Sequence, residues 1–195
     1  MEFVPSDRFT IIDDHDPIVL NTNLRMMQNQ IRHIHLNQYR IQPNSITSRF
    51  SLNFMTNLHF LDITDDSADC KCLGYLTTTD GSYENILHLN IAGSCHLNNR
   101  MIRQISIAFP RLQTLRFQLK FCSSSTEQLD VIGLGILTTM KFLRYLHVRF
   151  SEDNLLIMTM IPSENQLGEW LGHNQRRFSH AQAIQLNRKE LAVWL

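Results

Sequence analysis

A short hydrophobic pattern recurs along this chain: an apolar residue, two variable residues, a second apolar residue, one variable residue and a third apolar residue. Successive copies begin 27, 28, 26, 31 and 38 residues apart. The copies are Ile31-Ile34-Leu36, Leu58-Leu61-Ile63, Ile86-Leu89-Ile91, Leu112-Leu115-Phe117, Leu143-Leu146-Val148 and a degenerate Ala181-Ile184-Leu186. Single matches to so simple a pattern arise by chance, but five good matches at nearly constant spacing do not. The chain is therefore built from repeated units.

The spacing within each copy predicts a short β-strand. The last two apolar residues are two positions apart and point to the same face of a strand, whereas the residue between them points to the other face. One such strand cannot bury its apolar face, but stacked copies can share a continuous core. We expect a helix in the intervals between strands, closing each unit and forming the second wall of that core.

Two intervals carry helix signals. Asn98 and Asn99 are N-cap residue types, and Pro110 ends the helix because proline disfavours helical geometry in the residue before it. The apolar stripe between them consists of Met101, Ile102, Ile105, Ala108 and Phe109. In the next interval Ser124 and Glu127 have the spacing of a capping box. The stripe there consists of Leu129, Ile132, Ile136, Leu137 and Met140.

The segment from Leu87 to Phe117, LHLNIAGSCHLNNRMIRQISIAFPRLQTLRF, resembles the cysteine-containing leucine-rich repeats of F-box proteins. In that family a strand is followed by a Gly/Cys turn, a capped helix, a proline and the next Leu-x-x-Leu strand. The following unit, FQLKFCSSSTEQLDVIGLGILTTMKFLRYLHV, has the same layout with Cys122 in the turn. The resemblance covers residues 25 to 150, and the first 30 residues contain no F-box helix bundle.

The resemblance implies an α/β fold, namely a leucine-rich-repeat right-handed solenoid. Such a short horseshoe has parallel strands on its concave face and helices on its convex face. We expect residues 1–24 to form an N-terminal cap with an edge strand from Phe9 to Ile12, and residues 25–150 to form the repeats. Residues 151–195 are expected to hold the degenerate last repeat and a C-terminal cap, because an end unit must hide its core. The apolar residues of this lid would be Trp170, Leu171, Phe178, Leu191 and Trp194.

The strand residues that point away from the core predict a binding surface. Across the stacked strands they fall into rows, and aromatic, imidazole and arginine side chains are common among them, as they are at protein interfaces. We therefore expect a protein or peptide partner, and the resemblance implies a substrate-receptor-like part in a ubiquitin ligase. The partner-binding candidates are His33, His35, Phe60, Asp62, His88, Asn90, Arg116, Tyr145, His147 and Arg149. The alternative is a solvated polar sheet that binds nothing.

Composition argues against nucleic acid and membranes as partners. Eighteen basic residues balance eighteen acidic ones, and isolated pairs such as Arg176-Arg177 do not make the basic stripe that nucleic acid requires. The longest apolar run, Leu155 to Ile161, is far shorter than the roughly 18–20 residues that span a bilayer. The sequence shows no signal-peptide pattern, and four cysteines are too few for a disulfide scaffold. We expect reduced thiols and a cytoplasmic or nuclear protein.

Metal and cofactor sites have little support. Cys95 and Cys122 fall at equivalent positions after successive strands, and Cys70-Lys71-Cys72 lies in the corresponding turn one unit earlier. A zinc site is conceivable there, but Cys-x-Cys is tighter than the usual ligand spacing, so we expect buried thiols and no metal. The acidic run that includes Asp65 lacks the glycine and glutamate of a calcium loop, and we interpret it as a solvated turn.

Enzymatic motifs are missing from the sequence. It contains no Gly-x-Ser-x-Gly, His-Glu-x-x-His or Walker pattern, and Gly133-Leu134-Gly135 falls inside an expected helix and not at a phosphate-binding turn. We therefore expect no catalytic residues and no cofactor. Two alternatives stay open, a hydrolase-type enzyme with a His/Asp/Cys cluster and a structural remnant without a specific ligand.

Overall fold

The computed structural model describes residues 8–12, 29–37, 52, 55–65, 70–78, 81–93, 99–119, 127–150, 163–187 and 189–195. Its strands and helices, in chain order, are β1 (Arg8–Ile12), β2 (His33–Asn37), β3 (Phe60–Thr64), α2 (Lys71–Thr78), β4 (His88–Ala92), α3 (Asn99–Ala108), β5 (Thr114–Leu119), α4 (Glu127–Thr139), β6 (Tyr145–Phe150), α5 (Glu164–Asn174), the 3-10 helix Gln175–Phe178, β7 (Ala183–Leu186) and β8 (Glu190–Trp194). The chain is an α/β protein with a mostly parallel, mixed sheet.

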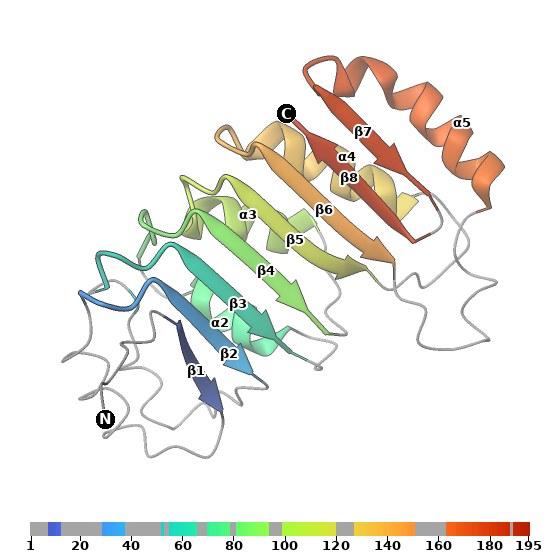
Figure 1. Cartoon of the computed structure of the whole chain (residues 1–195). Helices are drawn as coiled ribbons and strands as arrows, with labels where there is room; N and C mark the ends of the chain where they lie inside the picture. Colours follow the sequence, from blue (N-terminus) through green and yellow to red (C-terminus); the bar gives the residue numbers. More distant parts are fainter. Residues whose placement is uncertain are drawn as a thin grey trace, which may run out of the picture.

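The eight strands form one sheet in the order β1-β2-β3-β4-β5-β6-β8-β7. The first six are parallel and lie side by side in chain order, as Figure 1 shows. The expected strand of residues 9–12 is present as β1 and pairs with β2. Each of the first five triplets places its last two residues in one of the strands β2 to β6. The strand predictions for these five triplets are therefore confirmed.

The turns that lead into the strands also repeat. Before each strand from β3 to β6 the backbone makes a turn closed by a hydrogen bond of 3.2 Å. Its N–H donor belongs to Leu58, Ile86, Leu112 or Leu143, and the acceptor is the carbonyl three positions earlier. In each unit one backbone carbonyl also accepts hydrogen bonds from two successive N–H groups of the next unit. The carbonyl of Arg32 accepts from residues 59 and 60, and the carbonyl of His59 accepts from residues 87 and 88. The same carbonyl pairing recurs at Leu87 and Gln113. Backbone pairing between units thus extends beyond the strands.

Helices α2, α3 and α4 lie on one face of the sheet (Figure 1), and α3 contacts both of the others. The stripe predicted for α3 is buried at Ile102, Ile105, Ala108 and Phe109, and the helix ends before Pro110 as expected. In α4 Leu129 and Ile136 are buried, whereas the predicted cap Ser124 lies outside the described residues. Together with the inward strand residues, these side chains form one continuous hydrophobic core.

The C-terminal segment differs from the expected degenerate repeat. A capping box at Ser163 and Gln166 begins α5, and the Trp170 indole donates a hydrogen bond of 2.9 Å to Asp130 of α4. Strands β7 and β8 pair antiparallel with each other, and β8 also pairs antiparallel with β6. The sixth triplet lies in β7 and does not extend the parallel series, because β8 is inserted between β7 and β6. The few residues between β7 and β8 are too short for the helical crossover that parallel neighbours need.

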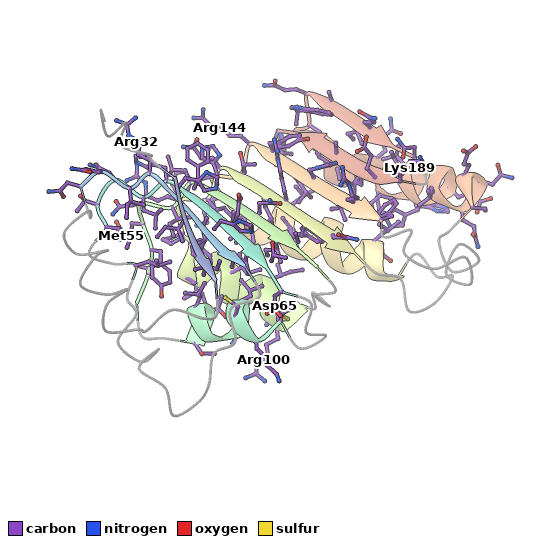
Figure 2. All side chains as sticks on the ribbon, turned by 60° about the horizontal axis from the view of Figure 1, so that its bottom comes forward. Arg32, Met55, Asp65, Arg100, Arg144 and Lys189 are labelled. Atoms are coloured by element: carbon purple, nitrogen blue, oxygen red, sulfur yellow. The ribbon has the colours of Figure 1, made fainter. Side chains whose placement is uncertain are left out.

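Asp65, which follows β3, is buried and does not lie in the solvated turn that the sequence predicts. This residue is only 7% exposed, and its carboxylate accepts a hydrogen bond of 2.9 Å from the backbone N–H of Cys72. Cys72 lies in the first turn of α2, where N–H groups lack helical partners, so Asp65 caps that helix. Figure 2 shows Asp65 beside the helix layer.

The thiol prediction is wrong for Cys70 and holds for Cys72. Cys70 is disulfide-bonded, whereas Cys72 is free and buried. Cys95 and Cys122 themselves also lie outside the described residues. No described helix is long and apolar enough to cross a membrane.

Candidate functional site

The strand face turned away from α2, α3 and α4, called the open face here, carries every predicted partner-binding residue. Strand register sets these residues in rows across neighbouring strands, as the sequence predicts. The first row is His33, Phe60, His88, Thr114 and Tyr145. The second row is His35, Asp62, Asn90, Arg116 and His147. Arg149 lies two residues beyond His147 on β6, beside Gln118 of β5. The register thus brings residues from five strands onto one surface.

Aromatic rings meet in the first row. The rings of Phe60 and His88 are stacked with their centroids 4.3 Å apart and an interplanar angle of 9°, and His33 contacts the same phenyl ring at 5.8 Å. Phe60 contacts these two rings and still remains 43% exposed to solvent. A large apolar side chain held in this way presents a fixed flat surface to a partner.

The carboxylate of Asp62 binds an imidazole of the neighbouring strand. Its Oδ2 lies 2.7 Å from Nε2 of His33, and Nε2 of His35 lies 3.0 Å from the hydroxyl oxygen of Thr64. Both contacts run diagonally across the open face from β2 to β3. Each imidazole binds a side chain of β3 that lies one row beyond its own. These hydrogen bonds orient the two imidazoles, which leaves their ring faces as recognition surfaces.

A second aromatic cluster lies on β6 and β8. The Tyr145 ring contacts Trp194 with centroids 5.2 Å apart, and the guanidinium carbon of Arg116 lies 5.5 Å from the centre of the same tyrosine ring. Trp194 is 38% exposed. The sequence interpretation assigned Trp194 to an apolar lid, but the antiparallel pairing of β8 with β6 places it opposite Tyr145 on the open face. Of the other lid residues, Trp170, Phe178 and Leu191 are buried as expected, and Leu171 is partly buried against the core.

Two polar residues of the open face were missed by sequence reasoning. Glu190 of β8 accepts a contact of 2.9 Å from Nε2 of His147 through one carboxylate oxygen, and Gln185 of β7 donates to its other oxygen at 2.8 Å. The short apolar run that follows Glu190 in the segment ELAVW, which ends in a β-branched and an aromatic residue, is the signal that could have identified the strand. Its expected role as an amphipathic lid concealed that signal.

The open face is hollowed where β4, β5 and β6 end. A depression of about 230 Å³ is lined there by Asn90, Ala92, Arg116, Gln118, His147 and Arg149, with the backbone of the intervening residues below. Four of the predicted partner-binding residues thus line one hollow. Arg116 and Arg149 are both exposed, so their guanidinium groups stand at its surface.

The environment of His88 is electropositive. Partial burial, together with the nearby His59 and Arg116, lowers the pKa of His88 below its ordinary value of 6.5. Cys72 has the opposite kind of shift, because burial and the charge of Asp65 raise the pKa of its thiol to about 12. His88 is therefore held in its neutral form on the open face, and Cys72 is held as an unreactive thiol within the core.

Within the parts of the chain that the structure describes, no three His, Cys, Asp or Glu side chains are grouped to hold a metal ion. The open face combines flat rings, guanidinium groups and oriented imidazoles. Side chains of these kinds can stack, form ion pairs and donate hydrogen bonds to another molecule.

No protein-family model matches the chain, and no curated protein matches it in sequence.

Proposed function

We propose that this chain is a protein-interaction module that binds a protein or peptide on the open face of its sheet. The observation that carries this proposal is the pair of exposed aromatic clusters, Phe60 with His88 and Tyr145 with Trp194, on one continuous surface. In the described part of the chain the helices α2, α3 and α4 lie on the other side of this sheet. Arg, Tyr and Trp are the residues that most often dominate binding energy at interfaces.

We further propose that the fold is a leucine-rich-repeat solenoid and that the protein acts as a substrate-receptor-like part of a ubiquitin ligase. Parallel strands in chain order, a helix in each interval between β3 and β6, and the repeated turn hydrogen bonds support the repeat assignment. The ligase connection rests on the resemblance of the segment from Leu87 to Phe117 to repeats of F-box proteins. Recovery of a ligase adaptor with the purified protein would support it.

A binding module fits the described residues better than a hydrolase with a His/Asp/Cys cluster. The His33–Asp62 pair is available as a base and its orienting group, but nucleophilic catalysis also needs an activated nucleophile nearby. Cys72 is buried and its raised pKa keeps the thiol protonated. A remnant without a specific ligand would show no partner that depends on the open face.

The cytoplasm or nucleus is our proposed compartment, and the Cys70 disulfide is the observation that tests it. Disulfides seldom persist in reducing compartments, so this disulfide weighs against the proposed compartment, and the oxidation state of Cys70 in the cell decides the question. Alkylation of thiols in intact cells, followed by mass spectrometry of the peptide that contains Cys70, measures this state. A fully oxidised Cys70 would contradict the assignment.

Affinity purification from the native cell, with mass spectrometry, tests the binding function. The wild type is compared with a variant that carries His88→Ala, Arg116→Ala and Tyr145→Ala together. The control carries Arg100→Ala and Arg103→Ala, which change exposed residues of α3 on the helix side (Figure 2). A true partner should lose about 2 kcal/mol or more of binding free energy with the triple variant and none with the control. Equal affinity for all three proteins would refute the assignment.

A further inference from the structure

Asp62 and Glu190, the two carboxylates of the open face, each bind an imidazole, whereas Arg116 and Arg149 contact no carboxylate among the described residues. Asp62 binds His33, and Glu190 binds His147 and Gln185. Glu190 lies directly opposite Arg149 in the strand register, yet both of its oxygens are turned to other residues. Among the described residues neither Arg116 nor Arg149 forms an ion pair. The surface therefore holds two guanidinium groups whose charge is not neutralised.

The same two arginines line the depression at the ends of β4 to β6. Its volume of about 230 Å³ is the space of roughly eight water molecules at about 30 Å³ each, enough for one amino-acid side chain. Asn90 and Gln118 add carboxamide N–H donors and His147 adds an imidazole to its lining. A planar guanidinium matches a carboxylate with two parallel hydrogen bonds, so the chemistry of this hollow suits a carboxylate side chain.

Arg116 also connects this hollow to the aromatic cluster. Its guanidinium lies over the Tyr145 ring, which in turn contacts Trp194. An acidic residue in the hollow would thus have an exposed aromatic surface directly beside it.

We propose that the depression lined by Asn90, Arg116, Gln118, His147 and Arg149 binds an Asp or Glu side chain of an acidic peptide, and that Tyr145 and Trp194 pack against an apolar residue of the same segment. This inference rests on the proposed binding function and adds the chemical class of the partner. A nucleic acid is disfavoured because backbone phosphates need a longer cationic track than two arginines supply.

Fluorescence polarisation with the full chain tests the inference. The probes are an array of labelled peptides in which one Leu or Phe is flanked by Asp and Glu, and a matched array with Asn and Gln in their place. We expect the acidic peptides to bind at least about tenfold more tightly than their amide counterparts, and higher salt to weaken this binding. Equal binding of the two arrays would overturn the inference.

Variants assign the binding to the hollow. Arg116→Gln with Arg149→Gln should weaken the best acidic peptide at least about tenfold, whereas Arg100→Gln with Arg103→Gln on α3 should leave its affinity unchanged. Arg149→Gln alone serves as the second variant if the double substitution reduces stability, because this arginine is exposed and makes no described ion pair. Unchanged affinity in Arg149→Gln and in the folded double variant would overturn the inference.

Two further probes separate the other anionic partners. One probe is a phosphoserine version of the peptide array, and the other is a single-stranded RNA oligonucleotide. Binding of either probe without binding of the acidic peptides would contradict the carboxylate assignment. The proposed function would still stand if a captured protein depended on His88, Arg116 and Tyr145 while no acidic peptide bound. Both would fail if no partner depended on the open face.

Discussion

The phenyl ring of Phe60 lies flat against the imidazole of His88, with the ring centroids 4.3 Å apart and the planes only 9° from parallel. The two residues are direct cross-strand neighbours of β3 and β4, although a whole helix separates them in sequence. The stack is a product of parallel register, and it creates a flat surface that neither residue could present alone.

We expect this stack to contribute measurably to stability. In a double-mutant cycle with Phe60→Ala and His88→Ala, the coupling free energy should be about 0.5–1.5 kcal/mol, the range typical of paired rings. Urea denaturation of the four proteins measures it. The same cycle with Phe60→Ala and the distant Arg103→Ala should give no coupling, and a coupling near zero for the stacked pair would contradict the predicted contact.

The alternation of β4 predicts opposite outcomes for two adjacent residues. Leu89 is only 1% exposed, so Leu89→Ala should lower the free energy of unfolding by about 2–5 kcal/mol through lost burial and a new cavity. Asn90 lies on the open face, and Asn90→Ala should change it by about 0.5 kcal/mol or less. Similar losses for both variants in urea denaturation would argue against the assignment of the two faces.

Asp65 is predicted to stabilise the first turn of α2. Asp65→Ala leaves the backbone N–H of Cys72 without its acceptor, and a buried group left unsatisfied costs about 1–3 kcal/mol. Asp65→Asn retains an acceptor oxygen and should recover part of this loss. Chemical denaturation of the three proteins measures the differences, and an alanine variant as stable as the wild type would disprove the capping role.

The Cys72 thiol should be unreactive in the folded protein. Its pKa of about 12 leaves almost no thiolate, the reactive form, at about pH 8. Mass spectrometry after treatment with a maleimide should find Cys72 unlabelled in native protein and labelled in denaturant. Rapid labelling of native protein would show that the thiol is more accessible than its burial indicates.

His88 should make the protein less stable at mildly acidic pH. Its folded pKa is below 6.5, so the unfolded chain binds a proton at this position more readily than the folded chain, and stability falls as pH decreases below about 6.5. His88→Asn removes this contribution. Comparing the free energies of unfolding at about pH 7.5 and about pH 5, we expect a smaller decrease for the variant. An identical decrease in both proteins would contradict this assignment.

Much of the parallel sheet could be predicted because its signals are local. The triplet of Ile86, Leu89 and Ile91 specifies which strand face is buried, since side chains alternate along a strand. The stripe of α3 and the proline after it likewise act within one helix. Aligning the triplets of successive units then predicts the register, and all ten candidate residues accordingly lie on the open face.

The remaining features depend on contacts between distant residues. Trp194 reaches Tyr145 because β8 returns antiparallel to β6, and a strand's direction depends on the chain that precedes it. Asp65 is buried because α2 begins beside it, and its carboxylate replaces a helical partner. The disulfide of Cys70 depends on which cysteine lies within bonding distance in the folded chain.

Local spacing therefore determined that this chain forms strands with one apolar face and one polar face, because each side chain's direction follows from its position in the strand. Only the tertiary structure decided which charges on the polar face were neutralised. Glu190 pairs with His147 and Gln185 and not with Arg149, which has no ion pair within the described parts of the chain, because a carboxylate binds the donors that strand packing brings within reach.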